Sequence, residues 1–171
     1  MVEKSVKFDE DGAKYDASEI VLFLEEMKGL TTKKNLQRLV KPLSAVVVFP
    51  DIMDHFAKEL GPDGKWSSWS ANYALKLRKQ GKGGNRILQD TGFLRQSFFP
   101  GSKTAGARVG NGQILWFNSA TTKSGFPYAA HHDAGKSDGQ RPRKFMWISD
   151  GALDKAAGLL LEFAVNPKRF K

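Results

Sequence analysis

The stretch Val109-Gly110-Asn111-Gly112-Gln113-Ile114 decides between an all-helical protein and a mixed one. An Asn-Gly pair accepts the two positive φ angles of a tight hairpin turn, and apolar residues flank this pair on both sides. We therefore predict two antiparallel strands joined at Asn111-Gly112. Two further strands are predicted downstream, at Tyr128–His131 and Phe145–Ile148.

The chain before this hairpin has the spacing of helices. Ser18 can cap a helix over Ile20–Met27, and the apolar residues that follow recur every three or four positions. Because proline lacks an amide hydrogen and clashes with the preceding turn, we expect a kink or a break at Pro42. A new helix is then predicted over Ile52–Leu60, and a short strand around Ser5–Phe8. The apolar positions around the expected kink are Leu36, Leu39, Val40, Leu43, Val46 and Val47.

Turn and cap residues mark the elements between these helices and the hairpin. Gly61-Pro62-Asp63-Gly64 predicts a turn, because proline presets the first φ angle and glycine accepts a positive φ. A helix is predicted over Ser70–Lys79. Asp90 or Thr91 can cap a short helix that places Phe93-Leu94 in the core.

A last helix closes the chain. Asp150 can cap a helix over Ala152–Val165, which Asn166-Pro167 ends, and the tail Lys168–Lys171 is expected to fray. Helices followed by a small antiparallel sheet and a closing helix predict the α+β class. The expected buried face of the last helix consists of Leu153, Ala157, Leu160 and Ala164.

Length and composition predict a single domain over residues 1–171. The hydrophobic fraction of 40% and the charged fraction of 26% are near the averages of globular proteins. Because the chain has 0 cysteines, disulfides, thiolate nucleophiles and cysteine zinc sites are excluded. The expected parts are an N-terminal extension (1–17), a helical part (18–60), a basic linker with a short helix (61–96), the sheet (97–149) and the last helix (150–165).

The net charge of +9 is unevenly distributed along the chain. Residues 1–64 hold 9 basic and 12 acidic residues, a net of −3, whereas residues 65–171 hold 18 and 6, a net of +12. Such a charge favours a polyanion or an acidic protein as partner, although it also suits a basic domain kept dispersed by its charge. The longest apolar run, Ala45–Phe49, is far shorter than the ~20 residues of a membrane span, and no signal peptide is predicted. We therefore expect no membrane partner.

The densest basic stretch is interleaved with aromatic residues such as Trp69 and Tyr73. Aromatic rings beside cations can hold single-stranded nucleic acid by stacking. The same stretch suits a solvated surface, a surface that meets an acidic protein, or the lining of a DNA passage. Its members, predicted to be DNA-facing or solvated, are Lys76, Arg78, Lys79, Lys82 and Arg86.

A second basic cluster, Arg141-Pro142-Arg143-Lys144, precedes the strand predicted at Phe145. Proline keeps the preceding residue extended, so the two arginines flank a stiff link. Guanidinium groups suit carboxylates and phosphates. We predict that Arg141, Arg143 and Lys144 dock on a partner during assembly.

Candidate catalytic and metal-binding residues are few. Neighbouring residues of a strand point to opposite faces, so His131 and His132 should not hold one ion together with Asp133. No serine lies in a nucleophile motif, and no carboxylate pair after residue 64 has the spacing of an acid–base pair. We expect a protein that is not an enzyme and has no metal or cofactor. A hydrolase whose site is spread over unlinked residues is a remaining alternative.

Five motifs occur in a fixed order between residues 56 and 145. The motifs are Phe56-Ala-Lys-Glu-Leu60, Pro62-Asp-Gly-Lys-Trp66, Ile87-Leu-Gln-Asp-Thr-Gly-Phe-Leu-Arg-Gln-Ser97, Tyr128-Ala-Ala-His-His-Asp-Ala-Gly135 and Arg141-Pro-Arg143 before Phe145. Together they resemble the phage virion morphogenesis family, the tail-completion proteins of Mu-like and P2-like bacteriophages.

The resemblance implies a structural protein of the virion tail or neck, assembled in the host cytoplasm. It would complete the tail or join it to the head connector, in contact with tail tube, tail terminator or head connector proteins. A compact chain of this length has a radius of gyration of ~15 Å and cannot enclose a duplex alone, so a neck role requires a ring of copies. Weak, sequence-independent contact with DNA is compatible with this role, and a basic nucleic-acid-binding protein of prophage origin is the alternative. The residues that the resemblance marks as structural are Trp66, Thr91, Gly92, Leu94, Tyr128 and Gly135.

Overall fold

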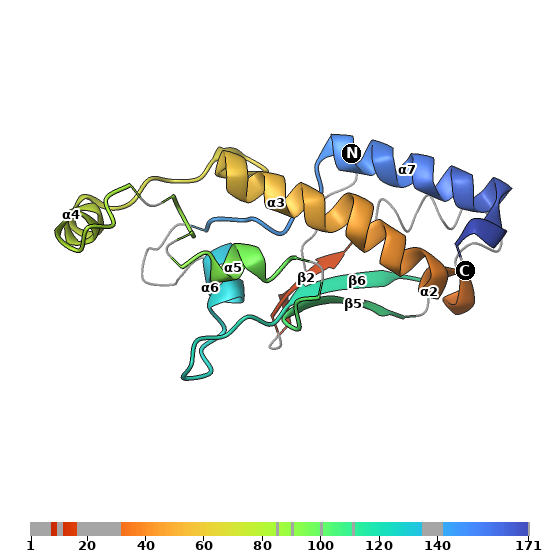
Figure 1. Ribbon diagram of the computed structural model, residues 1–171, viewed down its shortest axis with the longest axis horizontal. Coiled ribbons are helices and arrows are strands. Elements are labelled where there is room, and N and C mark those ends of the chain that lie inside the picture. Colours follow the sequence, from red (N-terminus) through yellow and green to blue (C-terminus); the bar gives the residue numbers. More distant parts are fainter. Residues whose placement is uncertain are drawn as a thin grey trace.

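A 26-residue helical rod organises the fold in the computed structural model of the chain (Figure 1). The rod consists of the α-helix α2 (Lys33–Pro42), the π-helix η1 (Leu43–Val48) and the α-helix α3 (Phe49–Lys58), which follow one another directly. Thr32 caps its start, where the Thr32 Oγ1 atom accepts the Asn35 N–H. The structure describes residues 8–9, 12–16, 32–84, 86–89, 91–99, 101–110, 112–134 and 142–170. The helix predicted over residues 20–27 lies outside them.

Of the kink or break expected at Pro42, the break does not occur. The helix continues through Pro42 and widens into the π-helical turns of η1, which accommodate a missing hydrogen-bond donor. The helix continues because the rod has one apolar face that is buried on both sides of the proline. Leu39, Leu43 and Val47 on this face are at most 1% exposed. Burying such side chains gains about 1.5–3 kcal/mol each, which together outweighs the ~3 kcal/mol cost of an interior proline.

One face of the rod packs on an antiparallel sheet with the strand order β1-β2-β6-β5. The predicted hairpin is confirmed: β5 (Ala105–Val109) pairs with β6 (Ile114–Asn118), and the Gly110 N–H donates to the Gln113 carbonyl at 3.0 Å. Along β6 the residues at 114, 116 and 118 are buried, as alternation in a strand requires. The other strands are β1 (Phe8–Asp9) and β2 (Gly12–Asp16), of which the sequence predicted only the position of Phe8.

The two strands predicted after the hairpin are wrong. Tyr128–Ala134 forms the helix α6, and residues 145–148 form no helix and belong to neither sheet of the described chain. Residues 145–148 are instead held by side chains from the rod and from α6. The amino-acid composition of this segment gives no information on hydrogen bonds from residues that are distant in the sequence.

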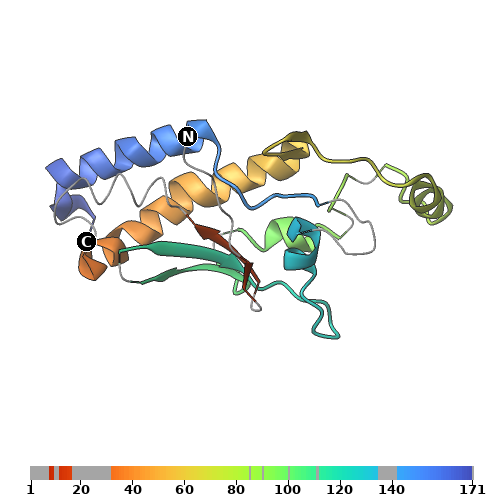
Figure 2. The ribbon, with the colours of Figure 1, turned by 180° about the vertical axis from the view of Figure 1, so that it is seen from behind.

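The helix α7 (Asp150–Val165) covers the face of the rod opposite the sheet (Figures 1 and 2). Its cap is Ser149, whose Oγ accepts the Ala152 N–H at 3.3 Å, and not Asp150 as predicted. Of the predicted buried face, Leu160 is confirmed, but the other buried residues of α7 are Ala152, Ala156 and Phe163.

The tail does not fray as expected. It forms the 3-10 turn η2 (Pro167–Arg169), and the Arg38 side chain of α2 donates to the carbonyl oxygens of Pro167 and Phe170. The Phe170 ring also packs edge-on against Phe163 of α7, with ring centres 5.2 Å apart. These contacts tie the end of the described chain to the start of the rod.

Three small elements complete the fold. The turn predicted at 61–64 is confirmed as a hairpin of β3 (Leu60–Gly61) and β4 (Gly64–Lys65), with Gly64 at a φ of 113°. The predicted helices near 70–79 and 93–94 are present as α4 (Ala71–Lys79) and α5 (Phe93–Gln96). The helix α4 projects away from the rod and the sheet, at the end of two extended segments (Figures 1 and 2).

Candidate interaction surface: a basic helix held away from the body

The projecting α4 helix carries most of the basic stretch that the sequence singled out. Ser70 caps α4, since its Oγ accepts the Tyr73 N–H at 3.3 Å. Leu77 is the buried residue of this helix, whereas Lys76, Arg78, Lys79 and Leu75 are exposed. The segment 65–89, which includes α4 and both of its connections and is called the arm below, contains six basic residues and no acidic one.

The outgoing side of the arm is rooted in the core by two tryptophans. Trp66 is 7% exposed, packs edge-on against Phe56, and donates its Nε1–H to the Lys144 carbonyl at 3.0 Å. The Trp69 ring lies 5.0 Å from the Tyr73 ring at the base of α4. The indole rings thus fix the direction in which the arm leaves the body.

Arg143 holds this root from the other side. Its guanidinium lies over the Trp69 ring at 4.9 Å from the ring centre, and its Nε–H donates to the Ser67 carbonyl at 3.3 Å. The residue is 7% exposed, and this burial lowers the pKa of its side chain. The sequence singled out Arg143 for docking on a partner, but the structure places it inside the molecule as a clamp on the arm.

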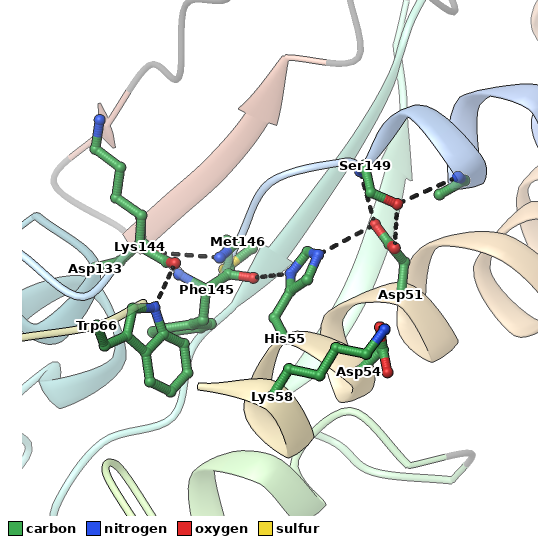
Figure 3. A network of polar contacts seen from close by, with 11 residues as sticks. Asp51, Asp54, His55, Lys58, Trp66, Asp133, Lys144, Phe145, Met146 and Ser149 are labelled. Carbon is green, nitrogen blue, oxygen red and sulfur yellow. Dashed lines mark hydrogen bonds and ion pairs between the residues drawn. The ribbon is translucent and has the colours of Figure 1, made fainter. Parts of the chain in front are cut away.

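The other residues of the second basic cluster take different positions. Lys144 is partly buried, and its carbonyl oxygen receives the Trp66 hydrogen bond (Figure 3). Arg141 and the motif residue Gly135 lie outside the described residues.

The returning side of the arm is attached to the end of α3. The Arg86 Nη1–H donates to the Ala57 carbonyl at 2.8 Å, and the Ile87 N–H donates to the Glu59 carboxylate at 2.8 Å. The Gln89 side chain reaches the Phe56 carbonyl at 2.7 Å. Arg86, predicted to be DNA-facing or solvated, is exposed and also caps one carbonyl at a helix C-terminus, where a cation is favourable. Lys76, Arg78 and Lys79 remain exposed on the arm, and Lys82 is partly exposed.

A buried carboxylate holds the segment that carries Arg143. The Asp133 Oδ1 atom accepts the N–H groups of Phe145 and Met146 at 2.8 and 3.0 Å (Figure 3). Asp133 is 1% exposed, and burial raises its pKa, although the two hydrogen bonds partly oppose the shift. The Arg143 N–H also donates to the His132 carbonyl at 2.8 Å. The segment 143–146 is therefore attached to α6 instead of adding a strand to the sheet.

Asp51, His55 and Ser149 form a second clamp whose composition resembles a catalytic triad. The Ser149 hydroxyl donates to Asp51 Oδ1 at 2.6 Å, and the Ser149 N–H donates to Asp51 Oδ2 at 2.9 Å (Figure 3). His55 Nδ1 lies 2.9 Å from the Phe145 carbonyl, and Nε2 lies 3.5 Å from Asp51 Oδ2. The His55 ring stacks on Trp147 at 4.2 Å, and burial lowers its pKa.

This order of contacts differs from that of a hydrolase. A nucleophilic serine needs the histidine as its base, whereas this serine contacts the carboxylate and caps α7. Since a carbonyl oxygen only accepts hydrogen bonds, Nδ1 is assigned as the protonated nitrogen of His55. The arrangement therefore attaches the segment 145–149 to α3. Within the described ranges, no group of three or more His, Asp or Glu side chains has the geometry of a metal site.

Residues of the motifs that begin at Ile87 and at Tyr128 meet where α5 lies beside α6 (Figure 1). Gly92 adopts a φ of 71° before α5, and the Thr91 Oγ1 atom accepts the Phe93 N–H at 3.3 Å. Leu94 is 3% exposed, but Phe93 is 47% exposed, so its predicted place in the core is wrong. The Phe93 ring instead lies 6.3 Å from the ring of Tyr128, whose pKa burial raises to about 12.

Helix α6 also changes the interpretation of the adjacent histidines. His131 and His132 were expected on opposite faces of a strand, but on a helix their ring centres lie 5.6 Å apart. The His131 ring packs against Phe126 at 4.9 Å, and the His132 ring lies 6.4 Å from Tyr128. Both histidines thus belong to a row of aromatic contacts along α6.

Comparisons with protein-family models, with curated proteins and with solved structures found no match for the chain. Among the helices that the structure describes, none is long and apolar enough to cross a membrane.

Proposed function

We propose that this protein is a structural assembly protein of a tailed bacteriophage, which completes the tail or joins it to the head connector. Copies of the chain form a ring around the DNA passage, and the ring contacts tail tube, tail terminator or head connector proteins. The observation that carries the proposal is the arm. Contacts at both ends of this segment hold its helix α4 away from the body. The resemblance to phage virion morphogenesis proteins supports the same role.

The arm is suited to contact another macromolecule. Its six basic residues lie in 25 positions without an acidic residue, so their charges are not neutralised within the arm. The exposed Leu75 adds apolar surface beside them. Charge attracts a partner from a distance, and an apolar side chain adds affinity on contact.

The alternative function, direct binding of nucleic acid, has the same charges in its favour. The aromatic rings that could stack on bases are less available, because Arg143 lies over the Trp69 ring and Tyr73 packs against that ring. Both rings thereby serve to root the arm. Positive charge alone gives only salt-dependent, sequence-independent DNA binding.

Deletion of the gene from the phage genome that encodes the chain tests the proposed function. We expect heads and tails, or shortened tail precursors, to accumulate separately in electron micrographs, and a plasmid-borne copy to restore joined particles. Normal yields of infectious particles after deletion would refute the assembly role. Micromolar or tighter binding of the purified chain to duplex DNA with a steep salt dependence would favour the alternative.

A further inference from the structure

The outer face of α7 has exposed residues that no described part of the chain covers. Asp154, Gly158, Leu161 and Val165 recur at helical spacing on this face, and Leu161 and Val165 are 53% and 82% exposed. A Cβ atom at Gly158 would meet nothing within 4 Å. Glycine lowers helix stability, and no contact within the described chain requires a glycine at position 158.

The outer face of α4 offers a matching pair of side chains. Leu75 is 52% exposed, and Lys79 lies one helical turn beyond it, also exposed. On α7, Gly158 and Asp154 are likewise four residues apart. Four residues of an α-helix rise about 6 Å, so an apolar site and a charged site have the same separation on both helices.

We propose that α4 of one copy packs antiparallel on the outer face of α7 of a second copy. Leu75 then lies over Gly158 beside Leu161, and Lys79 approaches Asp154. The opposite charges of Lys79 and Asp154 select this register, since the reverse direction places Lys79 near Glu162, which is already paired with Arg169. The inference rests on the proposed ring and names the contact that builds it.

The positions of α4 and α7 explain why the helix that packs on the outer face of α7 comes from another copy of the chain. Helix α4 projects beyond one end of the molecule, whereas α7 lies along the rod (Figures 1 and 2). Trp66 and Arg86 fasten the two ends of the arm to the body, so α4 stays away from α7 of its own chain. A contact between two different surfaces is head-to-tail, and repeating it produces a ring when the rotation closes.

The variant Gly158→Gln tests this contact, with sedimentation velocity of the purified full chain as the readout. Glutamine favours the helix more than glycine does, and a Cβ atom at this position meets nothing within 4 Å, so the thermal midpoint should stay equal or rise. The added side chain occupies the site of Leu75, so the association constant should fall about tenfold or more. Unchanged association in this variant overturns the inference.

A charge exchange tests the register. Lys79→Asp and Asp154→Lys should each weaken association, and the two changes together should restore it. The matched control combines Lys79→Asp with Asp63→Lys, at an exposed acid in the β3-β4 turn, and should not restore it. Failure of the exchange to restore association overturns the pairing, and a wild-type chain that stays monomeric at ~100 μM overturns the contact. The deletion experiment tests the assembly function separately, because it measures the yield of joined particles and not the contact between copies.

Discussion

Replacing Arg143 with alanine separates a structural role of this residue from a docking role. The guanidinium lies 4.9 Å from the centre of the Trp69 ring and donates to the Ser67 carbonyl, and the residue is 7% exposed. A desolvated cation–π contact contributes about 1–2 kcal/mol, and a hydrogen bond from a charged donor contributes about 1.5–3 kcal/mol. Because the hydrogen bond of 3.3 Å is long, we expect Arg143→Ala to lower the free energy of unfolding by about 2–4 kcal/mol.

Urea unfolding measures this loss, and hydrogen exchange of the α4 amides shows whether the arm loosens before the body unfolds. The matched control is Arg108→Ala, because Arg108 also lies 4.9 Å from an aromatic ring centre, that of Phe117, but is exposed. An exposed cation–π pair contributes at most about 1 kcal/mol. Equal losses in the two variants, or unchanged exchange of α4 in Arg143→Ala, would refute the clamp and return Arg143 to the candidates for docking.

Three further predictions concern the core and the clamps. Asp133→Ala leaves two buried N–H groups without an acceptor and should cost about 2–6 kcal/mol, whereas Asp133→Asn keeps an acceptor and should cost less; equal urea midpoints would contradict this. Since burial lowers the pKa of His55, the unfolded chain binds its proton more tightly, so stability should fall as the pH drops below ~6.5, and His55→Gln should flatten this loss in thermal midpoints. Leu94→Ala should cost about 2–5 kcal/mol and Phe93→Ala less than ~1 kcal/mol, and the reverse order would show that α5 is misplaced.

Elements with strong local chemistry could be predicted from the sequence. The Asn-Gly turn, the turn at 61–64 and the helices α4 and α5 depend on backbone angles and caps that neighbouring residues supply. The α+β class follows from their order. The basic character of residues 76–86 was equally visible, since formal charge does not depend on the fold.

The errors arose where distant groups decide the backbone. Residues 145–148 have the composition of a strand, but Asp133 and His55 take the backbone hydrogen bonds of Phe145 and Met146. Pro42 remains within a helix because the apolar residues on both sides share one core. The sequence predicted a surface position for Arg143, whereas its contacts with Trp69 and Ser67 bury it.

By itself, the sequence determined the local elements, the surplus of positive charge and the order of the motifs, because each depends on covalent neighbours. Only the tertiary structure decided which cations are available to a partner. Burial and hydrogen bonding place Arg143 inside the molecule and fasten Arg86 to α3, and they leave Lys76, Arg78 and Lys79 exposed on the projecting helix. The physical reason is that these contacts join residues about 30 to 80 positions apart, and a linear pattern carries no information on such contacts.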